Sequence, residues 1–157
     1  ESTAVSSKRH PMTMWYKMGA KKDGTILALD AVLTSDSGAY ASYGPAVITR
    51  AMTHATGPYE IPNVRVNATF VYSNNIMSGA FRGFGVPQVA VAHEGQMDIL
   101  AEKLGISPVE IRLKNALKVG SYTPTGQELL DSVGIIETIN KAVEKAKDVI
   151  YNEGEVK

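Results

Sequence analysis

The stretch Met12-Thr-Met-Trp-Tyr-Lys-Met-Gly-Ala-Lys-Lys-Asp-Gly-Thr-Ile-Leu-Ala-Leu-Asp-Ala-Val-Leu33 decides the fold. In residues 12–20, three methionines and a tyrosine alternate with Thr, Trp and Lys, which is the period of a β-strand with two different faces. Asp23-Gly24 then offers the positive φ angles of a tight hairpin turn. The chain returns through the largely apolar residues 25–33. We therefore expect a hairpin of two strands.

Further elements follow on the C-terminal side. The sequence predicts, in this order, a helix over about 46–56, a strand over about 64–72, a helix from Pro87 to Leu104, a short helix from the capping box Ser107–Glu110 to about Leu117, and a last helix that carries Ile135, Ile139, Ala142, Val143 and Ala146. Three strands followed mainly by helices indicate the α+β class, with a mixed sheet and packed helices. We expect one domain over residues 1–157.

Composition and charge exclude several classes of protein. The 16 Lys and Arg residues balance 16 Asp and Glu residues, so the chain has no basic field for nucleic acid or anionic lipid. It has no cysteine, which excludes disulfides and thiolate-bound zinc or iron–sulfur centres within it. No apolar run approaches the roughly 20 residues that span a bilayer, and we expect a cytoplasmic protein. The start without methionine favours an excised piece of a longer chain.

The loop Gly79-Ala80-Phe81-Arg82-Gly83-Phe84-Gly85 is the most unusual feature. Amides at the start of the following helix could hold anionic oxygens, Arg82 would add a planar donor fork, and Phe84 a flat apolar wall. An anionic cofactor beside a planar substrate would suit such a loop. The pattern lacks both Gly-x-Gly-x-x-Gly and the lysine of a phosphate-binding loop, so a purely structural turn is an equal alternative.

Arg50 is the second candidate, because it is the one charged residue between Ser37 and Tyr59 when histidine is neutral. It either binds a partner or serves the structure, by reaching solvent or by pairing with an acid such as Glu60. The three histidines, His10, His54 and His93, are far apart and lack the spacing of a helical metal site, so we predict no metal ligand among them.

Several short motifs together resemble a known family. These are Lys8-Arg9-His10-Pro11, Arg50-Ala51, Tyr59-Glu60-Ile61-Pro62-Asn63, Ala80-Phe81-Arg82-Gly83-Phe84-Gly85-x-Pro87-Gln88 and Arg112-x-Lys114-Asn115. In this order and spacing they look like the molybdopterin-binding region of xanthine dehydrogenases and aldehyde oxidases. The resemblance covers nearly the whole chain, and it departs from the commonest form of the loop at Val86, where a further glycine is usual.

The resemblance implies a molybdenum-molybdopterin cofactor in a parent oxidoreductase that hydroxylates a carbon with oxygen from water. It implies that Ala80, Phe81, Arg82 and Gly83 bind the cofactor, that Phe84 stacks on a planar ring, and that Arg50 points at a substrate oxygen. Arg50 favours a purine or related N-heterocycle as substrate. An aldehyde oxidoreductase of the same family is the alternative.

The resemblance also implies parts outside this chain. The family's catalytic glutamate and the glutamine that bonds the oxo group both fall outside residues 1–157, so we expect no catalytic residue here and no activity of the isolated chain. The expected partners are the remainder of the molybdenum subunit, iron–sulfur clusters and possibly FAD on other subunits or domains, and a small heterocyclic substrate.

Two hypotheses of other classes remain. Arg82-Gly83-Phe84-Gly85 reproduces the first half of an RNA-recognition strand, but Val86 stands where that signature needs an aromatic residue, and Pro87 would remove a hydrogen-bond donor from the strand. The second hypothesis is a structural or assembly domain of the same family, which keeps the fold without the cofactor.

Overall fold

The computed structural model describes residues 5–152, and its centre is a three-stranded sheet in the order β1(Met12–Ala20), β2(Ile26–Asp36), β3(Asn63–Val71). Strands β1 and β2 are antiparallel, with Met12 opposite Ser35. Between them the Lys21 amide donates to the Thr25 carbonyl at 2.8 Å, and Gly24 has a φ of +86°. The predicted hairpin is confirmed.

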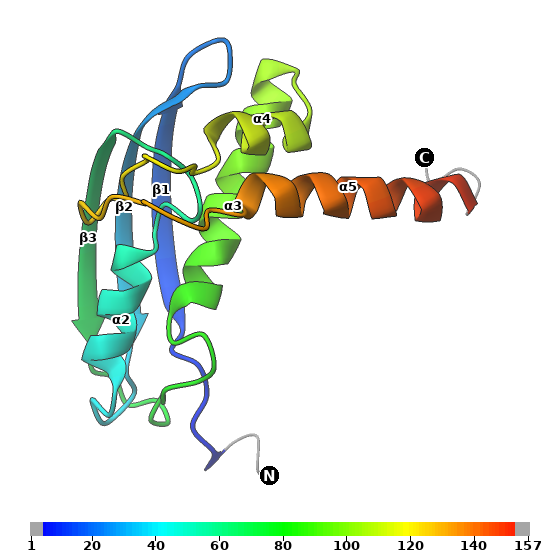
Figure 1. Cartoon of the computed structure of the whole chain (residues 1–157). Helices are drawn as coiled ribbons and strands as arrows, with labels where there is room; N and C mark the ends of the chain where they lie inside the picture. The colour runs from blue at the N-terminus through cyan, green and yellow to red at the C-terminus, as the bar shows by residue number, and fades with distance from the viewer. Residues whose placement is uncertain (1–4, 153–157) are drawn as a thin grey trace.

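Strand β3 runs parallel to β2, with Leu29 opposite Val64. The connection between the two strands contains helix α2(Gly44–Thr53), as a parallel pair requires a crossover. The sheet is therefore mixed, and the α+β class is confirmed (Figure 1).

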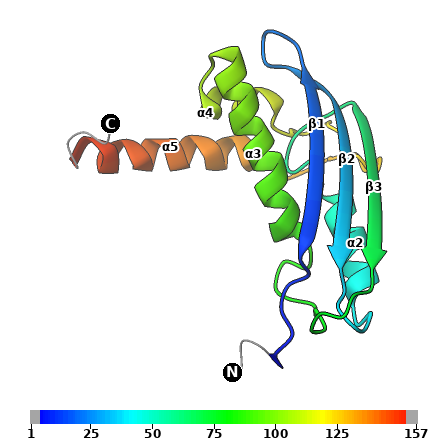
Figure 2. The same cartoon turned by 180° about the vertical axis from the view of Figure 1, so that it is seen from behind.

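Helices α2 and α3(Val86–Leu104) lie on the same face of the sheet (Figure 2). One core cluster joins Leu33 of the sheet to Ala51 of α2 and Val89 of α3. A second joins Leu29 to Met97 of α3 and Ile111 of α4(Pro108–Asn115). The opposite face of the sheet is open, and Trp15 there is 53% exposed. Because Ala51 of α2 and Val89 of α3 pack on the same part of the sheet, the middle of α2 lies next to the start of α3.

The remaining helices were predicted, with two differences. Helix α4 ends at Asn115 and not near Leu117, and the Ser107 hydroxyl accepts the Val109 amide, while no described contact completes the capping box through Glu110. Helix α5(Ile135–Asn152) carries the expected Glu137–Lys141 ion pair at 2.6 Å. It contacts α4 and projects away from the sheet, as Figure 1 shows. None of the described helices is long and apolar enough to cross a membrane.

Candidate cofactor and substrate site

The glycine-rich loop turns tightly before α3. Gly83, Phe84 and Gly85 have consecutive positive φ angles of +91°, +52° and +97°. The Phe84 amide donates to the Phe81 carbonyl at 2.7 Å, and the Val86 amide to the Gly83 carbonyl at 3.1 Å. Two of the three positions need glycine for this path, whereas Phe84 adopts a conformation that costs a side-chain-bearing residue about 1–2 kcal/mol.

Gly85 also brings the loop into contact with α2. A Cβ atom at this position would clash with the backbone carbonyl oxygen of Val47 and would lie 3.2 Å from Cβ of Ala51. The start of α3 and the middle of α2 thus touch through backbone atoms. This contact fixes the position of Phe84 relative to the side chains of α2.

Phe84 and Arg50, the two residues predicted to bind substrate, line the same cavity of about 550 Å³. Its lining consists of Pro45, Ala46, Thr49, Arg50, Thr53, His54 and Phe84. None of these residues is acidic, and Arg50 makes no ion pair within residues 5–152. Glu60 accepts a hydrogen bond from the Ser121 hydroxyl at 3.0 Å and forms no ion pair with Arg50 in the described part of the chain. Arg50 is exposed, so the alternative in which it reaches solvent stays open beside a role in binding.

Ala80, Phe81, Arg82 and Gly83, the residues predicted to bind cofactor, are all exposed. In the described part of the chain, the amides of Arg82 and Gly83 donate no backbone hydrogen bond and the Arg82 guanidinium makes no ion pair. Two free amides beside a guanidinium suit an anionic group. The residues present therefore fit an anionic pterin cofactor.

The N-terminal motif Lys8-Arg9-His10-Pro11 holds this loop from one side. The Gly79 amide donates to the Lys8 carbonyl at 2.8 Å, and Nε2 of Gln88 donates to the His10 carbonyl at 3.3 Å. The Arg9 guanidinium carbon lies 4.5 Å from the centre of the Phe81 ring, which is a cation–π contact. Two motifs about 70 residues apart thus form one structure.

One residue that lines the cavity, His54, and one that packs on its wall, Tyr43, were not predicted. His54 lines the cavity, and its Nδ1 lies 2.9 Å from the Arg50 carbonyl oxygen. The same Nδ1 lies 3.0 Å from the Thr53 hydroxyl oxygen, so this nitrogen is held within the end of α2. The Tyr43 ring packs edge-on to Phe84, with centroids 6.4 Å apart. His54 follows Arg50 by four residues, a spacing that places both on one helical face and could have identified it.

The other two histidines lie in the core. His10 and His93 are nearly fully buried, and burial lowers the pKa of both imidazoles. Next to His93, Glu94 accepts from the Tyr59 hydroxyl and from Nε of Arg112, each at 2.8 Å. Burial first, and then the bond to Glu94, raises the pKa of the Tyr59 hydroxyl. This network joins α3 to α4 and to the segment after α2.

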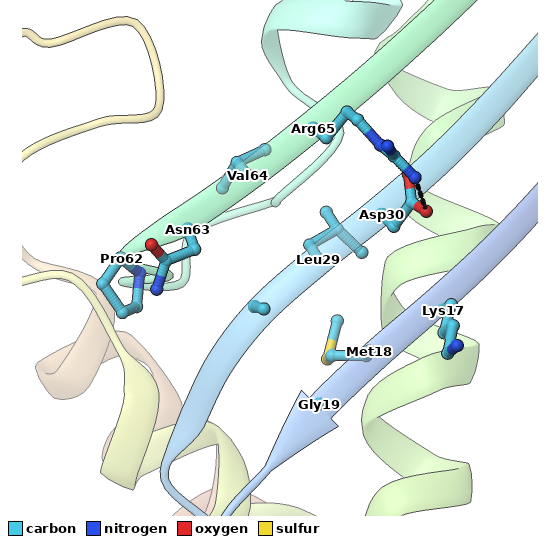
Figure 3. Close-up of a pocket in the computed structure, with 10 residues that line it drawn as sticks. Lys17, Met18, Gly19, Leu29, Asp30, Pro62, Asn63, Val64 and Arg65 are labelled. Atoms are coloured by element: carbon cyan, nitrogen blue, oxygen red, sulfur yellow. Dashed lines mark hydrogen bonds and ion pairs between the residues drawn. The ribbon is translucent and has the colours of Figure 1, made fainter.

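A larger hollow of about 680 Å³ lies over the sheet, along Lys17, Asp30 and Arg65 (Figure 3). Nε of Arg65 donates to the Asp30 carboxylate at 2.8 Å, so these two charged side chains of the hollow pair with each other. By strand alternation these side chains point away from α2 and α3. None of the predicted site residues lines this hollow, and we assign the candidate site to the cavity at Arg50 and Phe84.

Fold and site together define an α+β domain with an exposed glycine-rich loop next to a cavity lined by an aromatic ring and an arginine. The model of the molybdopterin cofactor-binding domain family matches residues 1–116, and the chain belongs to this family. The resemblance seen in the motifs is confirmed. The RNA-recognition hypothesis fails on the structure, because residues 82–85 form a turn and not a strand.

Relatives of this chain are much longer proteins. It is 63% identical over 150 residues to the nicotinate dehydrogenase large molybdopterin subunit of Eubacterium barkeri, covering 96% of this chain and 35% of that protein. It is 41% identical to a probable xanthine dehydrogenase component of Bacillus subtilis, and the match covers 89% of this chain and 19% of that protein. The solved structure of an aldehyde oxidoreductase from Desulfovibrio gigas superposes with a TM-score of 0.87 at 38% identity, and the match covers 93% of this chain and 16% of that one. The chain thus spans about a third or less of these relatives.

Proposed function

We propose that residues 1–157 form one domain in the molybdopterin-binding region of a larger molybdenum-binding subunit, and that the whole enzyme hydroxylates an N-heterocycle with oxygen from water. The observation that carries this proposal is the shared cavity of Arg50 and Phe84, a cation beside a flat aromatic wall. Relatives named for nicotinate and xanthine support an N-heterocycle.

Four exposed residues, Ala80 to Gly83, would hold the cofactor through the free amides of Arg82 and Gly83 and the Arg82 guanidinium. When bound, the cofactor supplies the molybdenum that transfers oxygen and takes up the electrons. Phe84 orients the planar ring of the substrate, and Arg50 donates to a substrate oxygen on which negative charge develops. The base that removes a proton belongs to other parts of the enzyme.

The other parts of the enzyme are proposed from the same family. The remainder of the molybdenum subunit closes the site. Iron–sulfur clusters on other subunits or domains carry the electrons away, either directly to the acceptor or through FAD. The cytoplasmic location stays a prediction. The aldehyde oxidoreductase among the relatives supports one second candidate, an aldehyde as the substrate.

The substitution Arg50→Met in the complete enzyme separates the two substrates. It should lower kcat/KM for xanthine or nicotinate by about two powers of ten, because a donor aimed at developing charge is lost. Benzaldehyde has no oxygen at that remote position and should be affected much less. The measurement is the ratio of the two catalytic efficiencies at equal molybdenum content.

The matched control is Arg65→Met, which removes an arginine that is paired with Asp30 and lies outside the cavity. It should leave the ratio unchanged. An unchanged ratio in Arg50→Met as well would contradict the proposed role of Arg50 and would leave the aldehyde as the better candidate. A complete enzyme without molybdenum would instead favour a structural domain.

A further inference from the structure

Tyr43 and Phe84 form an aromatic pair beside the candidate cavity, which Phe84 lines and Tyr43 does not. Their ring centroids are 6.4 Å apart and their planes cross at 61°, an edge-on arrangement in which two aromatic rings attract each other. Tyr43 directly precedes α2 and is 67% exposed, so the sheet core does not require an aromatic residue there. Its described aromatic contact is with Phe84.

Positive φ angles occur at Phe84 and at the residue before Tyr43. Three residues other than glycine have a positive φ in the described part of the chain, and two of them are Ser42 at +45° and Phe84 at +52°. Ser42 immediately precedes Tyr43. Strained conformations of this kind persist where the surrounding structure imposes them, and they cluster at ligand sites.

One face of α2 connects this pair to the cation of the cavity. Tyr43 and Arg50 are seven residues apart, which is two helical turns, or about 10 Å along the axis. Ala46 lies on the same face between them, and its small side chain leaves room above the helix. Phe84 lines the cavity together with Ala46 and Arg50, and Tyr43 reaches the cavity only through its contact with Phe84.

We propose that Tyr43 is a positioning residue, which sets the tilt of the Phe84 ring and so aligns a planar heteroaromatic substrate with Arg50. The proposal rests on the proposed function and deepens it. The Gly85 contact fixes the backbone of Phe84 against α2, which leaves only side-chain torsions to be fixed by Tyr43. The cavity takes a flat heteroaromatic ring with an oxygen-bearing polar end toward Arg50 and an apolar edge toward Tyr43.

The test compares Tyr43→Ala and Tyr43→Phe in the complete enzyme, with Tyr40→Ala as the matched control. Tyr40 belongs to the same connection and is 70% exposed, but no aromatic contact with Phe84 is present among the described residues. Steady-state kinetics with nicotinate and xanthine would be combined with the calorimetric Kd of nicotinate and with the Tm of each variant.

Tyr43→Ala should raise KM and Kd by about three- to tenfold, with a smaller change in kcat and an unchanged Tm. Tyr43→Phe should restore both values, because the ring and not the hydroxyl makes the contact. Tyr40→Ala should equal the parent enzyme. Equal KM and Kd in Tyr43→Ala and the parent, or no rescue by Tyr43→Phe, would overturn the role of Tyr43.

The proposed function fails on a different result. A parent enzyme that neither turns over nor binds a heterocycle would overturn that function and the role of Tyr43 with it. Normal turnover by the parent and by Tyr43→Ala alike would overturn only the role of Tyr43.

Discussion

At the scale of single residues, Arg82 is the exposed charge of the glycine-rich loop, residues 79–85. Its guanidinium makes no ion pair within residues 5–152, and its amide donates no backbone hydrogen bond there. An arginine that only stabilised the turn would be expected to contact the turn. The exposed guanidinium is consistent with the cofactor contact proposed above.

Arg82→Ala in the complete enzyme should lower activity by about two to four powers of ten, if the fork is a fixed charge at the site. Turnover and molybdenum content are the two measurements. The control is Lys118→Ala, which removes an exposed cation outside the loop and should change neither. Normal turnover at full molybdenum content would show that the loop is only a structural turn.

The sequence predicts part of the candidate site. A single charge in an uncharged segment singles out Arg50, and three glycines in a short span predict the unusual path of the loop, but the assignment of these residues to a ligand stays a prediction. Tyr43 was not recognised, because its role depends on a contact with Phe84, 41 residues later, and no local pattern contains that contact. The exposure of Arg82 likewise follows only from the folded loop.

At the scale of elements, Asn115 joins α4 to the β1–β2 hairpin. Its Oδ1 accepts the Ile26 amide at 2.8 Å, and its Nδ2 donates to the carbonyls of Gly24 and Ile111 at 2.9 and 2.8 Å. The side chain is buried, so water cannot replace these bonds. One amide group thus satisfies backbone groups of two elements.

Asn115→Ala should lower the free energy of unfolding by about 1–3 kcal/mol, because the Ile26 amide would be left buried without a partner. Denaturant unfolding followed by the fluorescence of Trp15, the only tryptophan, would measure the loss. Asn67→Ala, on the exposed face of β3, is the control and should change stability by less than about 0.5 kcal/mol. Equal stabilities of the two variants would contradict the bridging role.

The same region shows which features of the elements the sequence could predict. Alternation and the Asp-Gly turn predicted the hairpin, and apolar spacing predicted the helices. The end of α4 was placed too late because Ala116 pairs with Tyr59 in an isolated β-bridge, and the Leu117 amide donates to the Pro58 carbonyl. This pairing joins segments about 57 residues apart. The parallel direction of β3 also depends on how the crossover packs, which periodicity does not encode.

At the scale of the whole molecule, the site is open and the chain leaves apolar surface uncovered. Residues 80–83 of the glycine-rich loop are exposed, and Trp15 and Val32 lie on the open face of the sheet. Helix α5 projects from the rest of the molecule (Figure 2). The chain spans 35% or less of the relatives described above. The described residues line one side of the candidate site and do not enclose it.

This chain, expressed alone, should therefore be folded at least in part, bind no molybdenum and oxidise neither purines nor aldehydes. Elemental analysis, circular dichroism and turnover assays are the measurements. The complete enzyme, produced in the same cells, is the control and should carry the metal. Stoichiometric molybdenum and turnover in the isolated chain would contradict the view that other parts close the site.

The backbone contact at Gly85 has a consequence for redesign of the candidate site. It holds the glycine-rich loop against α2 without using any side chain that lines the cavity, so Ala46, Thr49 and Arg50 should be replaceable while the loop keeps its path. Any side chain at position 85 would instead meet the Val47 carbonyl oxygen and push the loop away from the helix.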